Sequence, residues 1–363
     1  PLRRQRQMCI RDRITTTAYR KAIDRLRRES SRDAKQREAL MLHDPEPPEP
    51  TGAIDDDRLR LLFTCCHPAL SLEGRVALTL RVVAGLTVEE IARAFLMQES
   101  AVRQRITRAK SKIKTAQIPY QVPAPEDLRV RIDGVLAVLY LVFNEGYFAS
   151  GSEMPALRSE LTTEAIRLTR LVRELLPDDA EVAGILALML LSEARSPARI
   201  TAKGELVRLD EQDRGLWNRE LIDEGLSLLD RLRGAVPGRY TLLAQINAVH
   251  AAAVDAELTD WQRIVELYEQ LERVDPSPVV TLGKAVAIAE RDSPQQALVI
   301  VESLRDALAD FHGLQVTRAE LLRAAGRPAD AMDAYDRAIS LASNDAEICL
   351  LYTSPSPRDQ RGS

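Results

Sequence analysis

Two short stretches of helical periodicity, separated by a break of a few residues, lie between positions 87 and 114 of the chain. Apolar side chains recur there at spacings of three and four residues: Val88, Ile91, Ala92 and Phe95 in the first stretch, and Val102, Ile106, Ala109 and Ile113 in the second. Such spacing places each set on one face of an α-helix. We therefore predict two helices, each with one buried face, joined by a tight turn.

The other faces of the second predicted helix carry cations, with no acid after Glu99: Arg103, Arg105, Arg108, Lys110, Lys112 and Lys114. A helix with an apolar stripe inward and cations outward suits the major groove of DNA. This pattern predicts a DNA-binding helix-turn-helix. A solvated face of an ordinary helix is the alternative.

Apolar periodicity continues on both sides of this pair and predicts an all-α fold. Residues 58–116 form one helical unit, in which Ser71 can cap a helix that ends at Gly85. An acidic, Pro-rich linker is expected at 41–57, and a second linker with three prolines at 117–127. Residues 128–235 are expected to form a packed helical domain, with a small hairpin at 200–209.

Residues 236–347 contain an internal repeat. A shift of about 34 residues superposes small or apolar positions on one another: Ala285 on Ala319, Ala297 on Ala331, Val301 on Tyr335, and Leu304 on Ala338. A period of this length, with small residues where two helices cross, is the signature of tetratricopeptide repeats. We predict a tetratricopeptide-like α-solenoid, with a generic helical bundle as the alternative.

The two ends of the chain fit nothing around them. Residues 1–13 and 348–363 resemble translated sequencing-adapter sequence, so we expect them to lie outside the fold. Residues 14–40 carry a thin apolar stripe among many cations, which predicts a basic helix.

Composition restricts the function classes. The net charge of −4 means that contact with nucleic acid must be local. Apolar runs fall short of the roughly 20 residues that a membrane span needs. Four cysteines, two of them adjacent, do not make a disulfide framework, which favours the reducing cytoplasm.

Three polar clusters could carry other chemistry. Cys65, Cys66 and His67 invite a metal site, but adjacent cysteines on a helix diverge by about 100°, so buried structural thiols are expected instead. The stretches 143–147 and 210–217 could form a buried network of Glu145 with Arg167 or Arg214, or could bind a small ligand.

An enzyme would have to use Asn144 and Glu145 with Asp213 and Arg214. The familiar catalytic and nucleotide-binding motifs are missing from the sequence, so we expect no catalysis and no cofactor.

With these features together, the chain resembles the bacterial extracytoplasmic-function sigma factors that carry a C-terminal tetratricopeptide extension. The resemblance covers residues 14–347 and rests on five stretches: TAYRKAIDRLRRE, LRLLFTCCHPAL, VALTLRVVAGLTVEEIARAFLMQESAVRQRITRAKSKIK, VLAVLYLVFNEGY and LDEQDRGLWNRELI. Three departures are visible. The chain starts partway through region 2, Arg20 stands where the family has Asn, and Leu96 occupies a turn position that is often Gly.

The resemblance implies a sigma factor whose partners are promoter DNA and core RNA polymerase. Residues 58–116 would be region 4, which reads the −35 promoter element with residues 98–112 as the recognition helix. Residues 20–28 would lie at the end of region 2, which holds the −10 element. It also implies control through the extension, with a possible protein or peptide partner on the repeats. A stand-alone helix-turn-helix regulator with a partner-sensing repeat domain is the alternative.

The residues expected to reach base edges lie near the start of the recognition helix: Ser100, Ala101, Arg103, Gln104, Arg105 and Arg108. Arg103 and Gln104 are the first choices for base reading, since Arg can pair with guanine and Gln with adenine. Cations expected to touch phosphates lie farther along this helix or in region 2: Lys110, Lys112 and Lys114, and Arg25, Arg27 and Arg28.

Overall fold

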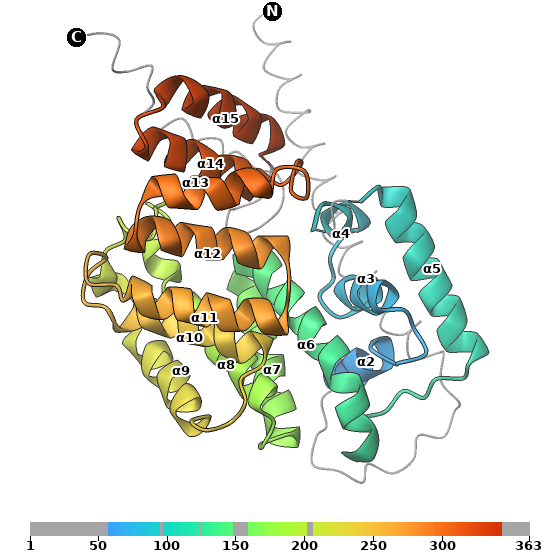
Figure 1. The fold of residues 1–363 in the computed structure, drawn as a ribbon. Coiled ribbons are helices and arrows are strands. Elements are labelled where there is room, and N and C mark those ends of the chain that lie inside the picture. The colour runs from blue at the N-terminus through green and yellow to red at the C-terminus, as the bar shows by residue number, and fades with distance from the viewer. Residues whose placement is uncertain (1–56, 95–96, 124, 148–158, 202–205, 343–363) are drawn as a thin grey trace, which may run out of the picture. The chain divides into compact units, whose positions relative to one another are not determined.

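The computed structural model describes residues 57–94, 97–123, 125–147, 159–201 and 206–342. These residues form fourteen α-helices and two short 3-10 helices, which confirms the predicted all-α fold (Figure 1). The hairpin expected at 200–209 is represented, in the described part of that stretch, by one isolated antiparallel bridge between Ile200 and Leu206. The predicted basic helix and the acidic linker lie outside the described residues, except that Asp57 begins the first helix.

The chain forms two compact units, residues 1–135 and 136–363. The boundary falls inside a helix, α6 (Pro125–Tyr147), whereas the sequence placed it in the Pro-containing segment 117–127. The first half of α6 is held by the first unit, where the Cys66 thiol donates to the Gly134 carbonyl with 3.8 Å between Sγ and O.

The described part of the first unit is a helix-turn-helix with supporting helices. They are α2 (Asp57–Cys65), α3 (Leu72–Val82), α4 (Val88–Ala94) and α5 (Glu99–Thr115). Ser71 caps α3 as predicted, because its hydroxyl accepts from the Gly74 N–H. Gly85 then adopts a left-handed conformation with φ of 71°, which suits glycine.

A capping box starts α4. The Thr87 N–H donates to the Glu90 carboxylate at 2.6 Å, and the Glu90 N–H donates to the Thr87 hydroxyl at 3.1 Å. The side chain of Ile91, one turn into α4, is fully buried. Phe95 and Leu96 lie outside the described residues, so the predicted place of Phe95 on this face stays a prediction.

The second unit begins with a group of helices, one of which is buried along nearly its whole length. They are α6 from residue 136 onward, α7 (Ser159–Leu175), α8 (Ala180–Glu193), η1 (Ser196–Ala198), η2 (Arg214–Leu216) and α9 (Arg219–Arg231). Every side chain of α8 from Val182 to Ser192 is buried, and α7, α9 and α10 pack against it. An apolar stretch with little amphipathicity therefore forms the centre of this part of the unit.

Helical hairpins follow and stack in sequence order, as Figure 1 shows. They consist of α10 (Arg239–Ala252), α11 (Trp261–Val274), α12 (Pro278–Arg291), α13 (Pro294–Ser303), α14 (His312–Ala324) and α15 (Pro328–Leu341). Helix α14 begins 34 residues after α12, and α15 begins 34 residues after α13. The superposed positions Ala285, Ala319, Ala297 and Ala331 are all fully buried. The predicted repeat is confirmed.

Candidate nucleic-acid interface

Helix α5 has the buried stripe that its sequence predicts. Val102, Ile106, Ala109 and Ile113 are all buried, and α5 packs against α3 and α4. Because one turn of helix takes 3.6 residues, this stripe fixes the direction of every other side chain on α5. The core of the first unit therefore aims the cations of α5 away from itself.

The face of α5 opposite the stripe is open. Ser100, Gln104 and Arg108 follow one another at four-residue spacing along this face, and all three are exposed. Lys112 is exposed next to this face, while Arg105 is half-buried on the same flank. Ala101, one of the residues predicted to reach base edges, is also half-buried.

Arg103 differs from the other cations of this helix. Its guanidinium lies 2.5 Å from the Glu99 carboxylate one turn earlier, and the Arg103 side chain is 64% exposed. An exposed pair of this kind contributes about 0–1 kcal/mol and is readily exchanged for another anion. The sequence did not predict this pairing, although a Glu four residues before an Arg is a recognisable signal for it.

A cleft that the sequence analysis missed lies beside the same helix, within the first unit. It has a volume of about 710 Å³, and apolar side chains such as Leu61, Leu78 and Ile118 form much of its wall. Four of its lining residues are cations: Arg81, Arg103, Lys110 and Lys114. The last three share one flank of α5 at spacings of seven and four, so Lys110 and Lys114 face the cleft more than the open face.

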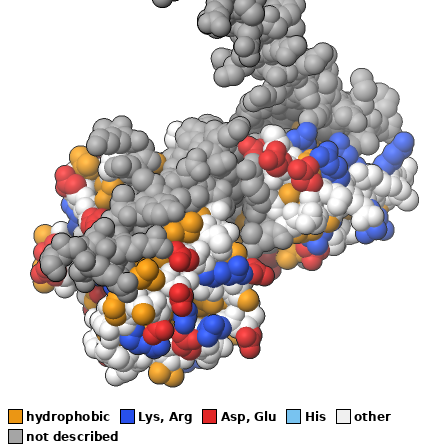
Figure 2. All heavy atoms as spheres, turned by 90° about the horizontal axis from the view of Figure 1, so that it is seen from above, with side chains coloured by type: hydrophobic (Ala, Val, Ile, Leu, Met, Phe, Trp, Pro, Cys, Tyr) orange, Lys and Arg blue, Asp and Glu red, His pale blue; other side chains and the backbone are white. Residues whose placement is uncertain are grey.

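Positive charge in the first unit is concentrated around α5. In the space-filling view, Lys and Arg side chains gather on the part of the first unit that carries α5 (Figure 2). The Gln98 side chain makes no capping hydrogen bond at the start of α5, and the Ala101 and Val102 N–H groups donate to the Gln98 carbonyl, which leaves the N–H groups of Glu99 and Ser100 at the helix end. Free N–H groups at a helix N-terminus attract phosphate.

The thiols beside this unit's core are structural. Cys65 and Cys66 are both buried and free, as expected, and burial raises the pKa of each thiol. The His67 Nδ1 accepts from the Ala69 N–H at 3.1 Å, and burial lowers the His67 pKa. In the described ranges, no group of three His, Cys, Asp or Glu is placed to hold a metal ion.

The other predicted site residues lie elsewhere or outside the described part. Arg25, Arg27 and Arg28 belong to residues that the structure does not describe. Glu145 is buried in α6, but Arg214 donates to backbone carbonyls of α10 and its loop rather than to Glu145. Arg167 pairs with Glu164 of its own helix at 3.0 Å, and the expected contact of Glu145 with Arg167 stays a prediction.

Comparison with known proteins agrees with this geometry. A family model described as Sigma-70, region 4 matches residues 60–113, which include the helix-turn-helix. A second model, described as a family of unknown function (DUF6596), matches residues 131–233. Among the described residues, no helix is long and apolar enough to cross a membrane.

Matches over most of the chain come from solved structures and from one curated protein. Solved structures of the human IFIT1 dimer with m7Gppp-AAAA and with PPP-AAAA give TM-scores of 0.37 and 0.38 at 13% and 14% identity. They cover 82% and 83% of this chain and 76% of IFIT1, and a likeness at this level bears on neither fold nor function.

An uncharacterized protein of Rhizobium meliloti (strain 1021), R00370, is 45% identical over 337 residues, covering 91% of this chain and 79% of that protein. The chain belongs to the same family as this protein, and in this chain a Sigma-70 region 4 domain precedes a helical extension.

Proposed function

We propose that the chain is a sigma factor of the extracytoplasmic-function type that directs core RNA polymerase to promoters in the cytoplasm. In this proposal α5 reads the −35 element and the helical extension regulates the activity. No catalysis by the chain is required. The observation that carries the proposal is an amphipathic α5, held by its buried stripe in a region 4 unit, with polar and cationic side chains on its open face.

The open face suits direct readout of bases. Gln104 can pair with adenine, and Arg108 can pair with guanine, through two parallel hydrogen bonds in each case. Both are exposed near the middle of the face opposite the core, with Ser100 one turn before Gln104. We therefore place Gln104 and Arg108 at the centre of the base-reading set, with Arg103 entering once DNA phosphate or a base replaces Glu99.

Backbone contacts would supply much of the affinity. Lys112 is exposed on the flank that also carries Arg105, and the start of α5 offers N–H groups to phosphate. Each phosphate contact that is formed raises the magnitude of the salt slope by about 0.9. Binding should therefore weaken steeply with salt although the whole chain has a net charge of −4.

Competition for core RNA polymerase tests the proposal against a stand-alone regulator. The full chain is titrated into core polymerase that is loaded with a fluorescently labelled reference sigma factor, and the anisotropy of the label is followed. Displacement of the reference supports a sigma factor. Specific DNA binding without displacement would instead favour a helix-turn-helix regulator whose repeats sense a protein or peptide.

A matched variant makes the result interpretable. Arg170→Ala removes a cation from the surface of the second unit, where Arg170 pairs with Glu224 at 2.7 Å. This variant should displace the reference as well as the wild type does. If Arg170→Ala lost the ability to displace the reference sigma factor, displacement would depend on nonspecific charge, and this result would overturn the proposal.

A further inference from the structure

Polar side chains from separate stretches of the second unit converge near the C-terminal end of α8. Arg195 follows this helix, and its Nη2 donates to Asn247 Oδ1 in α10 at 2.7 Å. Arg214 begins η2, and its Nη1 donates to the carbonyl oxygens of His250 at 2.7 Å and Ala253 at 2.8 Å. The segment before α9 is thereby tied to the end of α10.

Aromatic side chains line the same place. The Arg214 guanidinium lies over the Trp217 ring, 4.6 Å from its centroid. The Trp261 ring meets the His250 ring edge-on, with 5.4 Å between centroids. These are the two tryptophans of the whole chain. Indole fluorescence therefore reports on Trp217 and on Trp261, which neighbours His250.

Several polar atoms here are buried without being satisfied. In and beside the segments that meet here, four buried atoms have no hydrogen-bond partner within the described ranges: Glu193 Oε2, Arg195 Nε, Gln212 Oε1 and Trp217 Nε1. Trp217 is only 3% exposed, and the Asn218 N–H donates to the Ala194 carbonyl at 2.8 Å, which brings Trp217 beside Arg195. Unsatisfied polar groups are few in native proteins, and a cluster of them calls for a partner.

Cations outnumber carboxylates at this point: Arg195 acts on both Arg199 and Arg214, while the Glu193 carboxylate acts on Arg199. In the described part of the chain, Arg195 bonds to a neutral amide and Arg214 bonds to carbonyl oxygens. The pKa of His250 is lowered to about 4, mainly by burial and further by the charges of Arg195 and Arg214. Asp255 acts on Arg214 from a distance that is longer than an ion pair. Partly buried like charges are costly, and a bound anion relieves that cost.

We propose that this locus binds a small ligand through an oxyanion, a phosphate or carboxylate group, held between Arg195, Arg214 and the Trp217 N–H. Guanidinium groups match the planar geometry of such anions. The Gln212 and Glu193 oxygens would accept hydrogen bonds from hydroxyl or amine groups on the same ligand. The site is independent of DNA binding.

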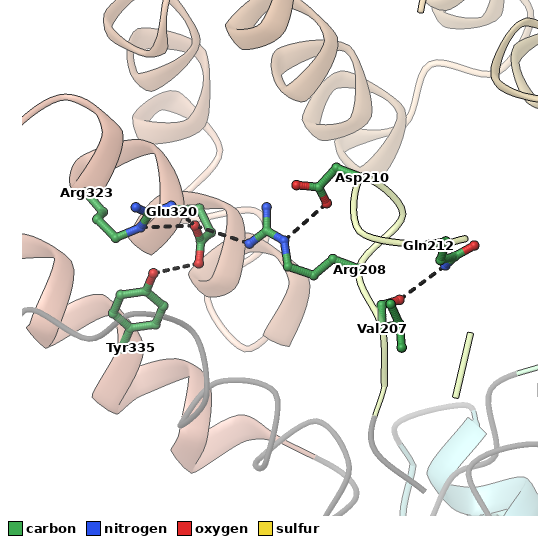
Figure 3. Close-up of polar contacts among 7 residues, drawn as sticks. All are labelled: Val207, Arg208, Asp210, Gln212, Glu320, Arg323 and Tyr335. Carbon is green, nitrogen blue, oxygen red and sulfur yellow. Dashed lines mark hydrogen bonds and ion pairs between the residues drawn. The ribbon is translucent and has the colours of Figure 1, made fainter. Parts of the chain in front are cut away.

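The same segment also reaches the repeats. Arg208 lies 3.3 Å from Asp210 and 3.5 Å from Glu320 of α14, and Glu320 accepts from the Tyr335 hydroxyl at 2.6 Å (Figure 3). Gln212 Nε2 donates to the Val207 carbonyl at 3.2 Å, which leaves its Oε1 for another partner. An anion bound at Arg214 would thus fix one end of a segment whose other end holds α14.

Tryptophan fluorescence of the full chain tests the site. Sodium phosphate and sodium acetate are titrated separately at constant ionic strength, with sodium chloride as the balancing and reference salt. A saturable change in emission with phosphate supports a phosphate-bearing ligand, and one with acetate supports a carboxylate. Arg195→Gln should weaken that binding by about tenfold or more, while Arg170→Gln should leave it unchanged.

Other outcomes would overturn the site. These are an equal response to sodium chloride, no saturable response to either oxyanion, or unchanged binding in Arg195→Gln. Far-UV circular dichroism establishes that the variant is folded. Should Arg195→Gln fail to fold, Arg195→Lys keeps the charge without the guanidinium fork, and binding as tight as in the wild type would equally reject the proposal.

Discussion

Helix α5 and the repeat helices use arginine in opposite ways. Within the described residues, the one ion pair of α5 is Arg103 with Glu99, while its remaining cations stay unpaired. Arginines of the repeat helices are regularly matched by acids, as in the pairs of Arg318 with Glu302 and Arg323 with Glu320. Figure 2 shows red and blue side chains interspersed on the second unit.

This contrast separates cations that are free to contact phosphate from cations that hold the fold. The net charge of −4 sums over the whole chain, so it does not reveal the unpaired cations of α5. A charge count over a whole chain therefore says little about DNA binding when one helix carries the interface. Substitutions at Val102, Ala331, Glu320 and Glu99 test whether the two groups of cations differ in this way.

The largest effect is expected where the core of the first unit aims α5. Val102 is 1% exposed, so Val102→Asp would bury a charge without a partner and destabilise this unit by about 3–5 kcal/mol. Thermal unfolding followed by circular dichroism measures the change. Lys112→Asp, on the exposed side of the same helix, should change stability by about 0.5 kcal/mol or less. Equal effects would mean that the buried stripe does not hold α5.

The repeats should be sensitive where their helices cross closely. Ala331 is fully buried at the start of α15, so Ala331→Leu would overpack this crossing and cost about 1–3 kcal/mol. Ala329 is exposed two residues earlier, and Ala329→Leu should be close to neutral. Urea unfolding of both variants gives the comparison. A neutral Ala331→Leu would contradict the need for small residues in the repeat.

Glu320 tests the paired use of arginine. Burial alone would raise its pKa, but Tyr335, Arg323 and Arg208 together lower it below the ordinary value of 4.5. Its charge therefore stabilises the fold above about pH 4.5, and this contribution is lost as pH falls through the lowered pKa. Glu320→Gln should cost about 2 kcal/mol at pH 7 and less at acid pH. A difference in unfolding free energy that does not shrink on acidification would reject this role.

Periodicity explains why much of this could be predicted from sequence. The stripe of α5 and the 34-residue repeat depend on local spacing, and both are confirmed. The cleft beside α5 and the meeting of Arg195 with the Trp217 segment depend on contacts between distant stretches, which no local pattern encodes. The unit boundary inside α6 was missed because prolines mark the start of that helix rather than the edge of a domain.

The smallest effect concerns the Glu99–Arg103 pair. Glu99→Gln would free Arg103 and remove one acid from the N-terminal end of α5, so affinity for DNA should rise, by an amount worth less than about 1 kcal/mol. The gain should fade at high salt, because exposed charges are then screened. Fluorescence anisotropy with labelled duplex at two salt concentrations measures it. Weaker binding by Glu99→Gln would show that Glu99 itself contacts DNA favourably.

Selection of binding sites from a random duplex pool tests the central claim most directly. The wild-type chain should enrich one short motif, and Gln104→Ala and Arg108→Ala should each cost about 1–3 kcal/mol and relax one base position. Lys112→Ala should instead weaken all sequences alike and reduce the magnitude of the salt slope by about 0.9. An unchanged motif in both Gln104→Ala and Arg108→Ala would contradict the reading of DNA by the open face of α5.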